Sequence, residues 1–166
     1  GGIAQKGSKI GKVKLVPKTV KDFKLTVKNG GNVVGTRSFK VRRIPAPSIA
    51  AYQGNRVVNL KTGIPAKTAR LDVKAIPDES FQKFLPKDAN FQVQQGAVYL
   101  VRAGNSIKTI PLKGPRINLA SIAPIARKGD NLVIEIKKVI RANYKKEFED
   151  FNNIPATSRV ITIPLR

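Results

Sequence analysis

Apolar and charged residues alternate along the first part of the chain, and this two-residue period constrains the fold most strongly. Between residues 23 and 28, Phe, Leu and Val alternate with Lys and Thr, and residues 39–42 read Phe-Lys-Val-Arg. Such alternation is typical of antiparallel strands with one buried and one exposed face. Residues 29–32, Asn-Gly-Gly-Asn, separate the two runs and tolerate positive φ, which predicts a β-hairpin. We also expect an earlier strand over residues 12–16.

The remainder of the chain also shows short strand patterns separated by Gly and Pro turns. The expected strands cover residues 56–60, 68–76, 90–94, 97–102, 107–112, 132–140 and 157–165. One of the expected turns is Gln95-Gly96. One or two helical turns are expected over 78–85 and 118–123, and a charged loop over 145–151. Regular short strands of this kind predict a mainly β fold, a β-sandwich or barrel with little helix.

A proline-rich segment predicts a boundary between two domains. Arg43 and Ile44 are followed by Pro45, Ala46 and Pro47. Prolines lack a backbone donor and restrict the preceding residue to extended conformations, so this segment should be a stiff linker. We therefore expect a first domain over 1–43, a linker over 44–48 and a second domain over 49–166. Arg43, Ile44, Pro45 and Pro47 are predicted to set the angle between the domains.

The composition excludes most catalytic and metal chemistry. The 166 residues include no Cys and no His, so thiolate nucleophiles, the commonest general base and the commonest zinc ligand are all missing. No phosphate-binding loop is present, because residues 7–13 place only three residues between their two glycines. We therefore predict a protein without enzymatic activity or cofactor. The absence of Met leads us to expect a processed or excised piece of a longer protein.

The charge is strongly positive, with 32 Lys and Arg against 10 Asp and Glu, a formal net charge of +22. Residues 1–43 alone carry +11, largely at the outward positions of the alternating pattern. This distribution leaves two alternatives, a nucleic-acid-binding β-domain and a basic surface that docks an acidic protein. The second is favoured because the aromatic residues fall on the apolar faces of the strands. The candidate docking residues on this basic face are Lys24, Lys28, Lys40 and Arg42.

Three carboxylates lie close together near the end of the chain, at Glu147, Glu149 and Asp150. They lack the spacing and central glycine of a calcium-binding loop, and two lysines precede them. A solvated loop and a contact surface for a partner are the two interpretations, and we include these three residues among the candidate docking residues.

Several segments resemble the periplasmic region of the GldM/PorM family of the gliding-motility and type IX secretion machinery. The run 38–47, Ser-Phe-Lys-Val-Arg-Arg-Ile-Pro-Ala-Pro, is similar to the family pattern Phe-x-Val-Lys-Arg-Ile-Pro-Asp-Pro, with Ala46 in the place of Asp. The run 129–139 resembles a late strand of the family after a Gly-Asp turn, and 159–165 resembles its C-terminal end. The resemblance covers residues 20–166.

This resemblance implies a structural role. Residues 1–43 would be the last strands of an immunoglobulin-like domain, and 49–166 the C-terminal domain. The parent protein would be anchored in the inner membrane by an N-terminal helix, with its periplasmic part forming a homodimeric shaft. Its expected partners are an inner-membrane motor protein of the GldL/PorL type and the outer-membrane-associated ring proteins of the GldK/PorK and GldN/PorN types.

Overall fold

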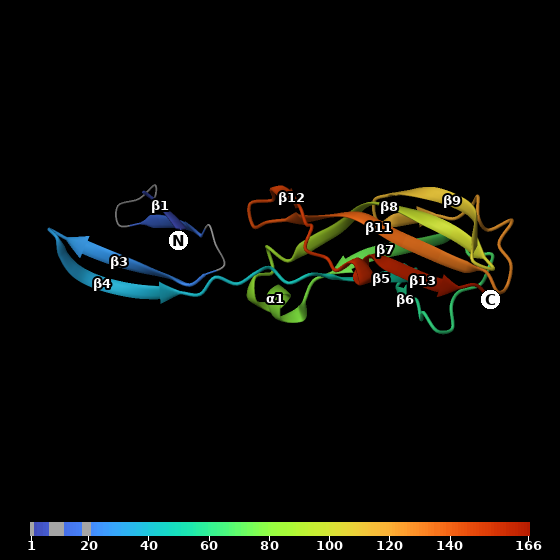
Figure 1. Ribbon diagram of the computed structural model, residues 1–166, viewed down its shortest axis with the longest axis horizontal. Coiled ribbons are helices and arrows are strands. Elements are labelled where there is room, and N and C mark those ends of the chain that lie inside the picture. The colour runs from blue at the N-terminus through green and yellow to red at the C-terminus, as the bar shows by residue number, and fades with distance from the viewer. Residues whose placement is uncertain (1, 7–11, 18–20) are drawn as a thin grey trace. The chain divides into compact units, whose positions relative to one another are not determined.

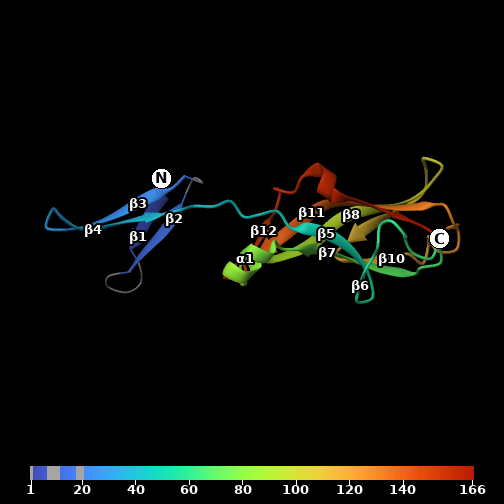
Figure 2. The same ribbon diagram turned by 90° about the horizontal axis from the view of Figure 1, so that it is seen from below.

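The computed structural model describes residues 2–6, 12–17 and 21–166, and the protein is mainly β with antiparallel sheets (Figures 1 and 2). The chain divides into two compact units, Gly1–Ile44 and Pro45–Arg166. The mainly β fold class predicted from the alternating pattern is confirmed.

The first unit contains two small antiparallel sheets. Strand β1 (Gly2–Lys6) pairs with β2 (Val13–Pro17), and β3 (Phe23–Asn29) pairs with β4 (Asn32–Phe39). Gly30 and Gly31 have φ of 54° and 87°, so they form the two-residue turn that the sequence predicts. The prediction of a strand over 39–42 is wrong. The turn pairs Phe23, the first residue of β3, with Phe39, so β4 has no partner beyond Phe39 and ends there. Lys40 and Arg42 therefore lie beyond β4.

The β3–β4 hairpin has one apolar and one polar face. Phe23 and Phe39 lie opposite each other with stacked rings, 5.3 Å between centroids. Lys24 lies opposite Ser38 on the other face and is exposed. The two Phe side chains are only half-buried, and Val27 remains 52% exposed. The alternation thus forms the expected two-faced hairpin, whose apolar face is incompletely covered within the unit.

The second unit is built from two antiparallel sheets. Its elements are β5 (Ser48–Gln53), β6 (Arg56–Val57), β7 (Arg70–Ile76), α1 (Glu79–Phe84), β8 (Asn90–Arg102), β9 (Asn105–Lys113), β10 (Arg116–Asn118), β11 (Asn131–Ala142), β12 (Phe148–Asp150), the 3-10 helix η1 (Ala156–Arg159) and β13 (Val160–Pro164). One sheet has the order β10-β7-β5-β6. In the other, β9, β8 and β11 are neighbours, and both β12 and β13 pair with the outer edge of β11. The arrangement is sandwich-like, and its core contains inward residues of both sheets, such as Val73, Val98 and Ile134, none of which is exposed.

A β-bulge changes the inward face of β11 midway along the strand. Leu132, Ile134 and Ile136 are buried, whereas beyond the bulge at Lys137 the buried residues are Val139, Arg141 and, at the end of the strand, Ala142. The alternation therefore passes from even to odd positions, because a bulge inserts one extra residue into the strand. The same switch occurs in the partner strand β8, which is buried first at Phe91 and Val93 and later at Val98 and Leu100.

The structure corrects several sequence predictions in this unit. Gln95-Gly96 is not a turn, because β8 runs without interruption through it. Gly96 meets the backbone of β11 so closely that an added Cβ would lie 2.2 Å from the carbonyl oxygen of Glu135. The predicted helical turns over 118–123 are not formed: Asn118 ends β10, and residues 119–123 form hydrogen-bonded turns. The charged segment 145–151 contains the short strand β12. The sequence analysis also missed β1, β5 and β10.

An ion pair with a buried carboxylate fixes the end of the sandwich at which β11 begins. Asp130 is 2% exposed and accepts two hydrogen bonds of 2.8 Å from Nε and Nη2 of Arg102 at the end of β8. The backbone N–H of Arg127 donates to the same carboxylate. The Arg102 guanidinium, helped by this N–H, lowers the pKa of Asp130 to about 2. The backbone carbonyl of Asp130 accepts from the N–H of Leu165, so the pair also holds the C-terminal strand.

We predict that Asp130→Asn lowers the free energy of unfolding by about 2 kcal/mol at neutral pH, because it leaves the Arg102 guanidinium without its charged partner. The folded-state pKa of Asp130 lies below the ordinary aspartate pKa of 3.8, so the unfolded chain binds more protons in acid. The stabilisation is complete above pH 3.8 and is lost as the pH falls through about 2. Denaturant titrations across this pH range should show that the difference in unfolding free energy between the wild type and Asp130→Asn decreases as the pH falls. The exposed Glu79→Gln serves as the control, and an equal loss in that variant would contradict the prediction.

We also predict that Gly96→Ala destabilises the second unit by about 3 kcal/mol, because the new methyl group forces β8 and β11 apart. The control is Gly104→Ala, where φ is 82° but the added Cβ meets no atom within 4 Å. This control should lose only about 1 kcal/mol, the cost of the backbone conformation. Thermal and denaturant unfolding of both variants measures the two losses of stability. Equal losses would show that the contact with Glu135 does not cause the destabilisation of Gly96→Ala.

Candidate docking surfaces

The basic residues predicted to dock a partner are exposed in the first unit. Lys24 and Lys28 lie on β3, and Lys40 and Arg42 lie in the segment that follows β4. Only the first two therefore project from a strand, so the four residues do not form one continuous strand face. The chain's linear alternation suggested a continuous face because it did not reveal where β4 ends.

The residues predicted to form the linker differ in their burial. Arg43 is exposed, Ile44 and Pro45 are half-buried, and Pro47 is buried. Residues 40–47 contain no helix or strand, and β5 begins at Ser48. The two compact units meet between Ile44 and Pro45. A role of these four residues in setting an interdomain angle stays a prediction.

The carboxylates near the end of the chain lie on a β-hairpin formed by β11 and β12. The Arg141 side chain is only 8% exposed, and its Nε and Nη2 donate to Oε1 of Glu149 at 2.8 and 2.6 Å. Its Nη1 donates to the backbone carbonyl of Asp88 at 3.0 Å, in the loop that follows α1. The Asp88 carboxylate in turn accepts from the N–H of Tyr144 in the hairpin turn. Glu149 therefore joins three segments of the unit through Arg141.

The other two carboxylates also have partners within the hairpin. Asp150 lies 2.9 Å from Nζ of Lys138, and Glu147 accepts a 2.9 Å hydrogen bond from the side chain of Asn143. Lys145 lies 3.9 Å from Glu147. Glu147 is the most exposed of the three, at 65% of its side chain, compared with 56% for Asp150 and 49% for Glu149. The structure thus places the three on one hairpin, each with its own partner, and it ties Glu149 most firmly to the body of the unit.

A half-buried polar contact links β8 to β11 beside the core. Tyr99 donates a 2.8 Å hydrogen bond to Glu135, and this bond raises the pKa of the phenol, which opposes its ionisation to a nucleophile. Within residues 2–6, 12–17 and 21–166, no three acidic side chains lie close enough together to hold a metal ion.

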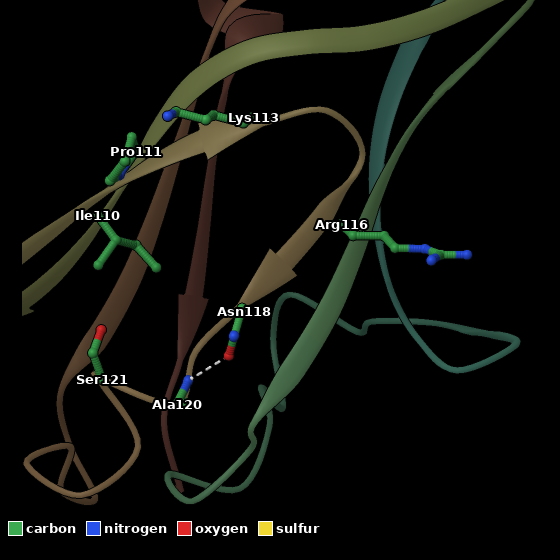
Figure 3. Close-up of a pocket in the computed structure, with 7 residues that line it drawn as sticks. All are labelled: Ile110, Pro111, Lys113, Arg116, Asn118, Ala120 and Ser121. Atoms are coloured by element: carbon green, nitrogen blue, oxygen red, sulfur yellow. Dashed lines mark hydrogen bonds between the residues drawn. The ribbon is translucent and has the colours of Figure 1, made fainter.

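Two shallow hollows lie on the surface of the second unit. The first, of about 330 Å³, lies by β9 and β10 and is lined by Ile110, Pro111, Lys113, Arg116, Asn118, Ala120 and Ser121. Figure 3 shows that the guanidinium of Arg116 points away from Ile110 and Ser121, so the polar groups do not converge on one point. The second, of about 340 Å³, is lined by Gln92, Gln94, Lys138, Ile140, Phe148 and Asp150. The first hollow therefore does not present the convergent polar groups that a small-molecule site needs.

Two surface features were missed by the sequence analysis. Phe84, Tyr144 and Phe148 are 87%, 59% and 65% exposed, and they belong to α1 and the β11–β12 hairpin at one end of the second unit (Figure 1). At the opposite end, loops distant in the sequence bring basic residues together. An aromatic residue within a charged segment, Phe148, was a sequence signal for the exposed aromatic side chains. The cluster of basic residues at the opposite end is visible only in the fold.

Comparisons with known proteins agree with the architecture. Among the residues that the structure describes, no helix is long and apolar enough to cross a bilayer. No curated protein and no solved structure matches the chain. The family model described as the GldM C-terminal domain matches residues 45–166, the whole of the second unit. The chain therefore belongs to the GldM family, a structural component of the gliding-motility and type IX secretion machinery.

Proposed function

We propose that the second unit is a non-enzymatic docking module in the periplasm, through which a longer GldM-family protein contacts the outer-membrane-associated ring. The ring proteins would be of the GldK/PorK and GldN/PorN types, and the inner-membrane motor partner would be of the GldL/PorL type. The observation that carries the proposal is the match of the entire second unit to the family's C-terminal domain. A module of this kind transmits force and needs no reacting groups.

The packing of the second unit supports a role in bearing load. The Arg102–Asp130 pair fixes one end of β11, and the Arg141 contacts with Glu149 and Asp88 fix the other. Each pair has one buried member, Asp130 in the first and Arg141 in the second. Removing the partner of a buried charge is costly, so each end of the strand is held in one geometry. A docking surface on such a framework keeps its shape when the partner moves.

We further propose that the apolar face of β3–β4 is covered by a second copy of the protein, in a homodimer. An isolated two-stranded hairpin is marginal in water. The apolar face of β3–β4 keeps Val27 52% exposed and leaves Phe23 and Phe39 half-buried, so a further layer would stabilise it.

The full chain is predicted to bind purified ring protein saturably at physiological salt. The alternative function, nucleic-acid binding, predicts affinity for duplex or single-stranded DNA. We expect DNA binding to weaken about a thousandfold between low and physiological salt, because it would depend on released counterions alone. Biolayer interferometry with immobilised chain measures both. Salt-resistant binding to DNA together with no binding to ring proteins would contradict the docking function and favour the alternative.

A further inference from the structure

The charge of the second unit is distributed unequally between its two ends. At the end with α1 and β12, residues 77–90 and 138–151 carry six acidic and six basic side chains. At the opposite end, residues 59–68, 102–105 and 119–130 carry five basic side chains and one acidic side chain, Asp130. One of these two ends, which lie opposite each other in the second unit (Figure 1), is therefore neutral by its count of charged residues, whereas the other is positive.

Hydrogen bonds bring the three loops of the positive end together. The N–H of Ile64 donates to the carbonyl of Pro164, and the N–H of Gly129 donates to that of Leu165. The loops 59–68 and 119–130 thus flank the same C-terminal residues. Nζ of Lys67 donates to the carbonyls of Ala123 and Pro124 at 3.1 and 3.2 Å. Arg102 also reaches the carbonyl of Ile125 at 3.0 Å. These contacts make one continuous surface from loops that are far apart in the sequence.

The single carboxylate at this end does not neutralise the surface. Asp130 is buried and committed to Arg102, whose guanidinium it binds through both oxygens. Lys61, Lys67, Arg127 and Lys128 are exposed, and none of the four forms an ion pair with another described residue. We call the surface formed by these four residues the basic end. Its charge is free to attract an external anionic surface.

The residues between these cations favour a protein partner over nucleic acid. Leu60 and Ile125 lie on the same loops and are 49% and 42% exposed, so apolar contacts are available beside the charges. The three loops contain no Phe, Tyr or Trp, the side chains on which single-stranded bases stack. The aromatic residues Phe84, Tyr144 and Phe148 lie at the neutral end instead. A mixture of exposed cations and aliphatic side chains is suited to an acidic protein surface with apolar patches.

We propose that the basic end is the docking surface of the second unit and that its occupant is an acidic surface of a protein partner. This inference rests on the proposed docking function and specifies which face of the module makes the contact and what chemistry the ring surface must have. It differs from the sequence prediction, which assigned docking to the hairpin carboxylates and to the basic face of the first unit.

The test compares two variants with the same change in charge. Lys61→Glu/Lys128→Glu reverses two residues of the basic end, and Lys83→Glu/Lys87→Glu reverses two exposed lysines at the neutral end. Lys67 and Arg127 are left intact because Lys67 holds the loop carbonyls and Arg127 adjoins Asp130. Circular dichroism and thermal unfolding confirm that both full-length variants remain folded. Biolayer interferometry against each ring protein at low and high salt then gives the association rate and affinity.

We expect the basic-end variant to associate about tenfold more slowly at low salt, and the control to stay close to wild type. A loss confined to the control variant, or an equal loss in both, would overturn this inference and leave the docking function standing. If the wild-type chain binds no ring protein, the docking function fails. The inference is then tested separately by NMR titration of the labelled full chain with an oligoglutamate peptide.

In that titration, amide shifts at residues 61–67 and 125–129 support the basic end as an acceptor of acidic polypeptide. Shifts confined to residues 2–44, or no shifts, overturn it. The same titration with duplex DNA and with vesicles of anionic phospholipid examines the other possible occupants. Stronger binding of either through residues 61–67 and 125–129 would overturn the assignment to a protein partner.

Discussion

The close contact between β8 and β11 determines the geometry of the second unit. Gly96 has no Cβ, so the carbonyl of Glu135 can approach it to a distance that any side chain would forbid. Next to this contact, β11 has a bulge at Lys137, and the inward face of the strand changes from even to odd positions. Without that change Arg141 would point outward. The buried guanidinium, its bonds to Glu149 and Asp88, and the position of the β11–β12 hairpin therefore all depend on one irregularity in the sheet.

This dependence explains which parts of the fold the sequence predicts. The alternation in β3 and the Asn-Gly-Gly-Asn turn predict the first strand and the turn of the β3–β4 hairpin correctly, because both signals are local. The second strand, expected over 39–42, lies at Asn32–Phe39. At residues 90–102, however, Gln95-Gly96 indicates a turn, whereas the structure has one long strand. A glycine that ends a strand and a glycine that admits a neighbouring backbone look the same in sequence. The distinction depends on the partner strand, which lies about 40 residues later in the chain.

The candidate surfaces follow the same logic. Counting charges along the chain places half of the net charge in residues 1–43, which is correct but describes only the linear order. The carboxylates at 147–150 look available for a partner in sequence, yet Arg141, Lys138 and Asn143 bind them within the fold. Lys61 and Lys128 look unrelated in sequence, yet their loops flank the same C-terminal residues. The ion pairs of the carboxylates and the clustering of the lysines both depend on contacts between distant parts of the chain, so neither can be deduced from composition.

The two arginines, Arg102 half-buried and Arg141 buried, have opposite effects on the surface charge. Arg102 takes up the only carboxylate of the positive end and removes it from the surface, so the exposed lysines there keep their full attraction for anions. Arg141 does the reverse at the other end, where it draws Glu149 onto the body of the unit and leaves a balanced surface. Each pair fixes one end of β11 in place and, at the same time, sets the charge that this end presents. A module whose rigidity and surface polarity arise from the same contacts can resist load while binding a partner in one orientation, because distorting either end would leave a buried charge without its partner.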